Sequence, residues 1–249
     1  MIESLVPVIL VSNEEFWLPY TLQSVLGWFN RYVIYDVGSQ DRTLDVINWF
    51  IHQAKKDSDV RVRTLPMCST DIQGTFRNAM IAEAESDYYF ILDGDEIWSP
   101  GALTAMKTEM FHMRGAYEVK GALYGVCRRL EVDHDLKQVH GRNNYVNHHR
   151  VYHRTATWVG THPGEDPRYP QTKANEHYFT DAVYMHHFHQ PDRSSKDSVV
   201  PGRMNRRYKP TYVRGELTPF DILQEIPMMQ SPIGTFPVNP RLKEIQNGR

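Results

Sequence analysis

Cysteine is scarce in this chain, which has only Cys68 and Cys127 among its 249 residues. Two cysteines so far apart make neither a disulfide framework nor a paired-cysteine metal site, and we expect a reducing, cytoplasmic setting. No apolar run approaches the ~20 residues that span a bilayer. The first residues also lack the basic lead and long apolar region of a signal peptide, and none is expected.

The chain also lacks a strong charge of either sign and two common phosphate-binding motifs. Its formal net charge is -2, so we expect no nucleic-acid partner. It has no Gly-x-Gly-x-x-Gly after the first apolar run and no Gly-x-x-x-x-Gly-Lys, which argues against a dinucleotide-binding Rossmann domain and a P-loop. Hydrophobic residues make up 41% and charged residues 23% of the chain, which is enough for a packed core.

Strand-like and helix-like segments alternate through the first part of the chain. Short apolar runs predict strands at 5–11, 31–36, 60–65 and 88–92. Helical spacing predicts helices at 16–29, 43–56 and 74–85. This order predicts an α/β fold with a mostly parallel central sheet, right-handed crossovers and helices on both faces. Further along, a helix is predicted at 102–113 and strands at 117–126, 128–132, 142–153 and 182–189.

The strand at 88–92 runs directly into Asp93, Gly94, Asp95 and Glu96. Three acids so close repel one another unless a cation or the donors of a ligand offset the charge. Ligands of open α/β sheets bind at the carboxyl ends of the strands, and hard oxygen ligands of this kind suit Mg²⁺ or Mn²⁺. A solvated acidic turn is the alternative for this stretch alone. Polar residues that converge on the same rim also follow the first two strands, at Ser12, Asn13, Glu14, Asp36 and Ser39.

Four stretches together resemble family 2 glycosyltransferases with the GT-A fold. They are Val-Ser-Asn-Glu-Glu at 11–15, Asp-Val-Gly-Ser-Gln-Asp-Arg-Thr at 36–43, Gly-Thr-Phe-Arg-Asn at 74–78 and Leu-Asp-Gly-Asp-Glu at 92–96. They follow the family's order and spacing within residues 1–105, although Val37 stands where the family usually has a second Asp. The resemblance implies a hexosyltransferase that uses Mn²⁺ or Mg²⁺ to move a sugar, with inversion, from a nucleotide-sugar donor to an acceptor hydroxyl. A UDP-sugar is the favoured donor, and the acceptor is a glycan or another hydroxyl compound.

The same resemblance assigns a role to each matching residue. Asp95 would bind the metal, with Asp93 as a second contact, and a late histidine often completes such a site in GT-A enzymes. His187 is favoured for this role, with His186 and His189 as alternatives. The donor-binding residues that the resemblance implies are Ser12, Asn13, Glu14, Asp36, Gly38, Arg77, Asp93 and Gly94.

The second half resembles the bacterial lipopolysaccharide-core glucosyltransferase branch in part. A Trp-Val-Gly-Thr-His stretch at 158–162 is followed by Glu165, although Pro163 and Gly164 intervene, and a late strand ends in histidine. Inverting transfer needs a carboxylate that takes the proton of the acceptor. Glu165 is the first choice for this base and Asp166 is the second.

Structural alternatives accompany several of these assignments. Asp41, Ser39 or Asp36 would cap the helix that begins near residue 43, and Asp41 is a better candidate than Asp36. Arg77 is a solvated helix residue if the motif around it carries no function. Trp158 is expected equally in the core or stacked on a sugar. The basic cluster at 203–209 is a solvated face, a cover for the donor diphosphate or a contact to anionic lipid or glycan, so peripheral membrane contact stays open.

Two other functions fit parts of the sequence. A phosphatase of the haloacid-dehalogenase type also has Asp-x-Asp after an apolar strand, but that motif normally opens the domain, and here three strand–helix units precede it. A non-catalytic nucleotide- or glycan-binding module would keep the fold without turnover. For the glycosyltransferase we expect a main GT-A domain at 1–190, with a donor-nucleotide half at 1–105 and an acceptor half at 106–190. An irregular C-terminal extension at 191–249 would follow it.

Overall fold

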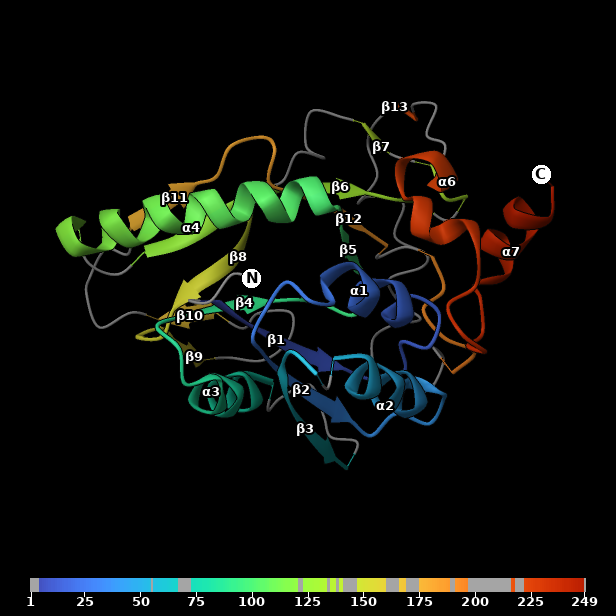
Figure 1. Ribbon diagram of the computed structural model, residues 1–249, viewed down its shortest axis with the longest axis horizontal. Coiled ribbons are helices and arrows are strands. Elements are labelled where there is room, and N and C mark those ends of the chain that lie inside the picture. Colours follow the sequence, from blue (N-terminus) through green and yellow to red (C-terminus); the bar gives the residue numbers. More distant parts are fainter. Residues whose placement is uncertain are drawn as a thin grey trace.

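Helices cover both faces of a curled central sheet in this α/β chain (Figure 1). The computed structural model describes residues 5–54, 56–66, 73–120, 123–133, 135–137, 139–140, 147–159, 166–168, 175–188, 191–196, 216–217 and 222–248. Within these residues the main sheet has nine strands. Two short pairs lie outside it, β9 (Thr157–Val159) with β10 (Asp166–Arg168) and β7 (Val139–His140) with β13 (Glu216–Leu217).

The first half of the sheet is parallel, as the sequence predicts. Its strands lie in the order β3 (Asp59–Leu65), β2 (Arg31–Val37), β1 (Leu5–Val11) and β4 (Tyr88–Ile91). The connecting helices are α1 (Leu18–Val25), α2 (Thr43–Ala54) and α3 (Gln73–Ala84). The register pairs Val11 with Asp36 and Val8 with Ile91. The carboxyl ends of β1, β2 and β4 therefore meet at one rim.

The second half extends the sheet beyond β4 with strands of mixed direction. Its strands are β5 (Glu96–Trp98), β6 (Leu123–Glu131), β8 (Asn147–His153), β11 (Asn175–Tyr178) and β12 (Tyr184–His187). The order continues β4-β8-β6-β12-β5, with β11 beside β6. β8 is antiparallel to β4 and β6, whereas β12 is parallel to β6 and antiparallel to β5. The acidic turn thus joins two strands, β4 and β5, that are not neighbours in the sheet.

The strand predicted from residue 117 begins several residues later than expected. The strand predicted at 117–126 starts at Leu123, because α4 (Pro100–Lys120) continues through residues 117–120. This helix is longer than predicted, and Met106, Met110 and Met113 along it all join the core beneath. β6 then runs without a break through the predicted gap at Cys127.

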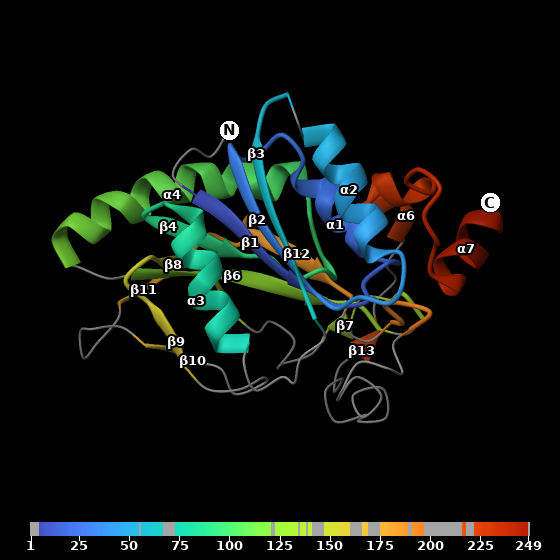
Figure 2. The same ribbon diagram turned by 90° about the horizontal axis from the view of Figure 1, so that it is seen from below.

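Each face of the sheet has its own apolar core. Side chains of β1 alternate between the two, with Leu5 and Ile9 in one core and Val6 and Val8 in the other. The first core includes residues of α1, α2 and α4, and the second includes residues of α3 together with Trp158 of β9. Figure 2 shows the two sets of elements on opposite sides of the sheet. The parallel half is therefore covered on both faces, as its continuous apolar strands require.

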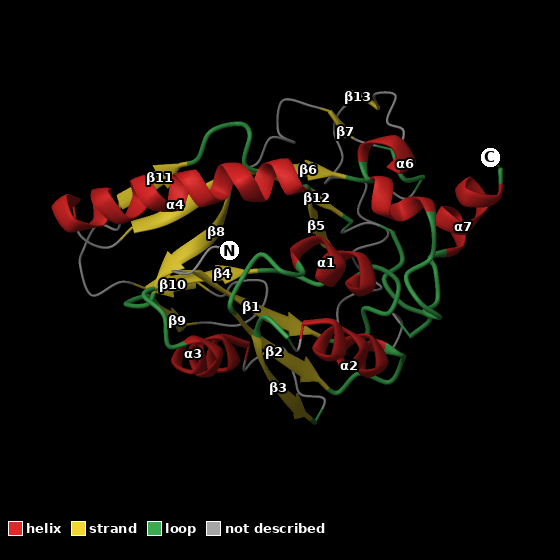
Figure 3. Cartoon of the chain, in the orientation of Figure 1, coloured by secondary structure: helices red, strands yellow, loops and turns green. Residues whose placement is uncertain are grey.

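A third core ties the C-terminal part of the chain to the rim near the acidic turn. Its elements are the short helices α6 (Ile222–Glu225), η4 (Pro227–Gln230) and α7 (Pro240–Asn247), drawn in red in Figure 3. They pack on Phe16 and Trp17 before α1, on Ile97 of β5 and on Phe188 after β12. The described part of the predicted extension therefore contains helices, while the domain boundary at residue 190 stays a prediction. Among the described residues, no helix combines the length and apolar character needed to cross a membrane.

Candidate active site

The loops that follow β1 and β2 are joined by hydrogen bonds. Asn13 has a left-handed backbone with φ 51°, and its amide N–H donates to Ser39 Oγ at 2.8 Å. Its side-chain oxygen accepts a bond from the Gln40 amide at 2.7 Å. Ser39 donates in turn to the buried carboxylate of Asp36 through its amide and hydroxyl groups. Asn13 and Asp36, both predicted to contact a nucleotide, therefore also shape the rim that would receive it.

Gly94 allows the acidic turn to pack closely on the loop after β1. A Cβ atom at this position would lie 2.9 Å from Glu14 Cγ and 3.0 Å from Val11 Cγ1. The Gly94 carbonyl accepts a hydrogen bond from Thr21 Oγ1 at 2.9 Å. Since a side chain would overlap both neighbours, glycine is the residue that permits this approach.

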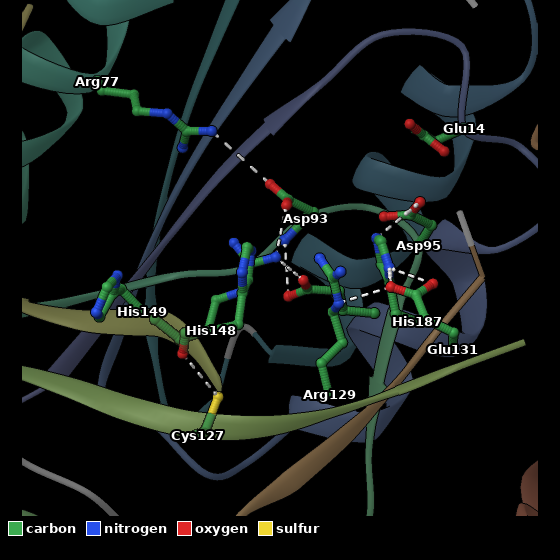
Figure 4. A network of polar contacts seen from close by, with 12 residues as sticks. Glu14, Arg77, Asp93, Asp95, Cys127, Arg129, Glu131, His148, His149 and His187 are labelled. Atoms are coloured by element: carbon green, nitrogen blue, oxygen red, sulfur yellow. Dashed lines mark hydrogen bonds and ion pairs between the residues drawn. The ribbon is translucent and has the colours of Figure 1, made fainter. Parts of the chain in front are cut away.

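Asp95 faces His187, and sheet pairing brings them together. The register pairs His187 with Glu96 of β5 and with Glu131 of β6. His187 Nε2 lies 3.6 Å from Asp95 Oδ2, and its Nδ1 lies 3.0 Å from both oxygens of Glu131. Figure 4 shows the ring of His187 between Asp95 and Glu131. An Nδ1–H that donates to Glu131 directs the Nε2 lone pair toward Asp95. Metal-binding histidines are oriented by carboxylates in the same way.

Asp93 and Glu96 share a buried arginine from β8. Arg150 Nη2 lies 2.9 Å from Asp93 Oδ2 and also contacts Glu96. Arg77 Nη2, from α3, lies 3.9 Å from the other oxygen of Asp93. Burial raises the pKa of Asp93, but the two guanidinium groups outweigh burial and hold that pKa well below its usual range. At Glu96 burial dominates and raises the pKa to about 8.

Glu131 and His187 also shift each other's pKa values. Burial raises the pKa of Glu131, but His187 and Arg129 outweigh burial and keep that pKa below its usual value. Arg129 Nε lies 2.6 Å from Glu131 Oε1. Burial lowers the pKa of His187, whereas Glu131 and Asp95 together raise it above its usual value. The carboxylates of Glu131 and Asp95 therefore favour a positive charge on the His187 ring or on a cation beside it.

Arg193, from the predicted C-terminal extension, also contacts Asp95. Its Nη2 lies 2.7 Å from Asp95 Oδ2, and its Nη1 lies 3.0 Å from Glu14 Oε1. The carbonyl of Arg193 accepts a hydrogen bond from the Phe16 amide at 2.9 Å. The extension thus contributes a side chain directly to the acidic turn.

Acidic side chains and arginines alternate in this site. The acids are Glu14, Asp93, Asp95, Glu96 and Glu131, and the arginines are Arg77, Arg129, Arg150 and Arg193. In the described part of the chain, no group of three or more His, Cys, Asp or Glu side chains is arranged to hold a metal ion. Asp95 and His187 nevertheless offer one oxygen and one nitrogen ligand. This pair fits a divalent ion that takes its other ligands from phosphate oxygens and water.

A family profile identifies the family of this chain. The profile of Glycosyl transferase family 2 matches residues 8–162, which is more than half of the chain. The chain belongs to Glycosyl transferase family 2. Comparison with curated proteins finds no matching relative.

One solved glycosyltransferase structure shares the fold of this family 2 chain, and a second is similar over part of it. The mannosyltransferase PcManGT from Pyrobaculum calidifontis, in complex with GDP-Man and Mn²⁺, has a TM-score of 0.56 at 11% identity and covers 98% of this chain and 68% of its own. TarS 1-349 from S. aureus has a TM-score of 0.47 at 12% identity over 75% of this chain, and this chain spans 60% of that structure. At such identities the likeness to PcManGT concerns the fold alone, which is GT-A.

The structure decides several alternatives for this family 2 chain. Asp41 caps α2, because its Oδ1 accepts a hydrogen bond from the Thr43 amide at 2.9 Å. Trp158 belongs to the core, where its Nε1 donates to the Tyr89 hydroxyl at 2.8 Å. Arg77 is buried rather than solvated, and its guanidinium lies over the Trp158 ring, 5.1 Å from the centroid. The aromatic stack therefore directs Arg77 toward Asp93.

Other predicted site residues of the family 2 chain are placed only in part. Glu165 and His189 lie outside the described residues, as does the basic cluster at 203–209. Asp166 begins β10, where its backbone pairs with Val159. His186 is buried, and burial lowers its pKa to about 4. Ser12 and Gly38 lie on the predicted rim, and Gly38 has φ 70°.

Four charged residues of the site are missing from the predictions made from sequence. Arg150 and Glu131 each adjoin apolar residues in strand-like stretches, and a charge in such a place is a signal of a buried partner. Arg129 lies two residues before Glu131 and has the same signal in weaker form. Arg193 lies in a proline- and arginine-rich stretch with no local pattern that marks it.

Proposed function

We propose that this chain is a metal-dependent, inverting glycosyltransferase that transfers a sugar from a nucleotide-sugar donor to an acceptor hydroxyl. The observation that carries the proposal is the orientation of His187, which Glu131 holds facing Asp95 in a chain of Glycosyl transferase family 2. A hexose as the transferred sugar, a UDP-sugar donor, a glycan or other hydroxyl acceptor and a cytoplasmic location belong to the same proposal. GDP-sugars are tested beside UDP-sugars because PcManGT was solved with GDP-Man and Mn²⁺.

The donor would bind at the rim formed by the loops after β1, β2 and β4. Asp95 and His187 would hold Mn²⁺ or Mg²⁺, which offsets the negative charge of the departing diphosphate. Arg77 adds a fixed positive charge beside Asp93, which is the acid proposed to face the ribose or the metal. The residues proposed to line the nucleotide are Ser12, Asn13, Glu14, Asp36, Gly38 and Gly94.

The chain's own groups have distinct tasks in the transfer. Glu131 orients the ring of His187, and Arg150 neutralises and positions Asp93. Inversion requires a carboxylate that takes the acceptor proton as the acceptor oxygen attacks from the side opposite the diphosphate. Glu165 is proposed for this base, with Asp166 as the second candidate, and residues 106–190 would bind the acceptor.

The test is release of nucleoside diphosphate from a panel of UDP- and GDP-sugars, with Mn²⁺, Mg²⁺ or EDTA. We expect slow hydrolysis of one donor with metal, and its loss in Asp95→Asn. Asp45→Asn is the matched control, because Asp45 is an acid of α2 that pairs with Arg42 at 3.0 Å, away from the acidic turn. Proton NMR of a transfer product then reads the anomeric configuration, which should be opposite to that of the donor.

The outcomes separate this proposal from its alternatives. Turnover that persists in EDTA or in a folded Asp95→Asn variant contradicts the metal assignment. Tight donor binding without hydrolysis or transfer indicates the non-catalytic binding module. Hydrolysis of simple phosphoesters that Asp93→Asn abolishes indicates the phosphatase.

A further inference from the structure

A guanidinium group already occupies the side of Asp95 that the proposed metal would share. Arg193 Nη2 lies 2.7 Å from Asp95 Oδ2, and His187 Nε2 lies 3.6 Å from the same oxygen. A divalent ion bound at this oxygen would adjoin the guanidinium, and two cations at contact distance in a buried site repel strongly. Arg193 and the metal therefore compete for one carboxylate oxygen.

The backbone that carries Arg193 is anchored on both sides. The carbonyl of Asp192 accepts hydrogen bonds from Trp17 Nε1 at 2.8 Å and from Asn239 Nδ2 at 2.9 Å. On the other side, the Ser195 amide donates to Glu15 Oε1 at 2.9 Å. A change of partner by the guanidinium thus needs rotation of the side chain only, and not release of the extension.

The second partner of Arg193 keeps the guanidinium in the site. Glu14 lies on the loop after β1, 3.0 Å from Arg193 Nη1, and the Arg193 side chain is only 13% exposed. A guanidinium that leaves Asp95 therefore stays within the polar site. The group it would meet there is the diphosphate of the proposed donor, which arginine binds through paired N–H donors.

We infer that the Arg193 guanidinium pairs with Asp95 until the metal binds there, and that it contacts the donor diphosphate once metal and donor are bound. This inference rests on the proposed function. In the first state Arg193 neutralises Asp95 and Glu14. In the second state it leaves Asp95 to the metal, keeps Glu14 and binds phosphate oxygens. The segment at 191–196 is thereby coupled to donor binding.

The first test is titration of the full chain with Mn²⁺ alone, in wild type, Arg193→Gln and Arg193→Lys, by calorimetry and by electron paramagnetic resonance. Removing the competing charge should tighten Mn²⁺ binding about tenfold in Arg193→Gln, whereas Arg193→Lys keeps a cation and should stay near wild type. Arg42→Gln is the control, because Arg42 pairs with Asp45 rather than with the acidic turn. Mn²⁺ binding in Arg193→Gln that is equal to or weaker than in wild type overturns the inference, and loss of structure cannot imitate the tighter binding expected.

The second test is binding of UDP and of GDP in saturating Mn²⁺. Arg193→Gln should weaken binding of the nucleoside diphosphate about tenfold, because an Arg–phosphate contact is lost. Unchanged affinity for both nucleotides overturns the diphosphate role.

A third measurement uses the wild-type protein and needs no folded variant. Phenylglyoxal modification of Arg193, read by peptide mass spectrometry with Arg42 as internal reference, should become faster with Mn²⁺ alone and slower with Mn²⁺ and a nucleoside diphosphate. A modification rate that neither addition changes contradicts the exchange of partners.

The Mn²⁺ titration separates failure of this inference from failure of the proposed function. If Mn²⁺ binds neither the wild type nor any variant, the proposed metal dependence is overturned as well. If wild type and Arg193→Gln bind Mn²⁺ equally, only the role of Arg193 is overturned.

Discussion

His187 Nε2 lies 3.6 Å from Asp95 Oδ2, where the antiparallel strands β5 and β12 pair. β5 begins one residue after Asp95 and pairs with β12, which ends at His187. The Phe188 amide also donates to the Asp95 carbonyl at 2.9 Å. Sheet pairing rather than a flexible loop therefore sets the geometry of the proposed metal site.

Replacing Glu131 tests whether His187 is held ready for a metal. Glu131→Gln keeps the shape of the side chain but removes its charge, so the Nε2 lone pair becomes less basic. We expect Mn²⁺ affinity, measured with a nucleoside diphosphate present, to fall about 10- to 100-fold. The matched control is Glu109→Gln, because Glu109 contacts His177 at 3.2 Å in a similar pair away from the site. If Glu131→Gln and Glu109→Gln lose Mn²⁺ affinity equally, the loss reflects a general decrease in stability and not the orientation of His187.

Arg150 is expected to matter for stability as well as for Asp93. Arg150→Met leaves Asp93 and Glu96 without the buried guanidinium that they share, and breaking a buried ion pair such as Arg150–Asp93 costs about 3–5 kcal/mol. Urea denaturation measures this loss, and a second substitution, Glu96→Gln, should recover part of it. The control is Arg154→Met, because Arg154 forms an exposed pair with Asp87 at 3.4 Å. A free energy of unfolding for Arg150→Met close to that of the control would contradict the buried network.

Gly94 is expected to tolerate no side chain. Gly94→Ala would place a Cβ 2.9 Å from Glu14 Cγ, and overpacking of this kind costs about 1–3 kcal/mol. The displaced turn should also weaken binding of UDP or GDP with Mn²⁺. At Gly101 the nearest atom to a new Cβ is Ser99 Oγ at 3.8 Å, so Gly101→Ala should leave both properties near wild type. Similar behaviour of the two variants would show that the close approach is not needed.

His153 is expected to make the fold sensitive to acid. Burial lowers its pKa below the ordinary value of 6.5, so the unfolded chain takes up a proton at a higher pH than the folded chain does. The contribution of His153 to stability is therefore present above about pH 6.5 and is lost as the pH falls through the lowered pKa. His153→Gln should flatten the decline in unfolding free energy below neutral pH. His52→Gln, at an exposed position of α2, is the control, and equal slopes in all three proteins would refute the prediction.

The parallel half of the fold is predictable from sequence because its signals are local. The apolar run at Leu5–Val11 has the same bounds in the sequence and in the structure, since a strand buried on both faces has to be apolar throughout. The positions of Asn13, Asp36 and Asp95 at the rim are predictable for the same reason, because each lies at or just beyond the end of such a run.

The charged network was not predictable in this way, because its contacts join distant parts of the chain. Arg150 meets Asp93 only because β8 pairs with β4, and Glu131 meets His187 only because β6 pairs with β12. Arg193 depends on anchors at Trp17 and Asn239. No periodicity within a short window contains such information. Trp158 shows the converse, since its motif is visible in the sequence but its burial depends on packing against Tyr89.

The most direct test of the proposed metal site is a crystal structure of the full chain with Mn²⁺ and UDP or GDP, with anomalous scattering measured to locate manganese. We expect a manganese peak bonded to Asp95 and His187 and to the diphosphate of the nucleotide. A bound nucleotide with no manganese beside Asp95, or manganese held elsewhere while Arg193 still contacts Asp95, would contradict the proposed site.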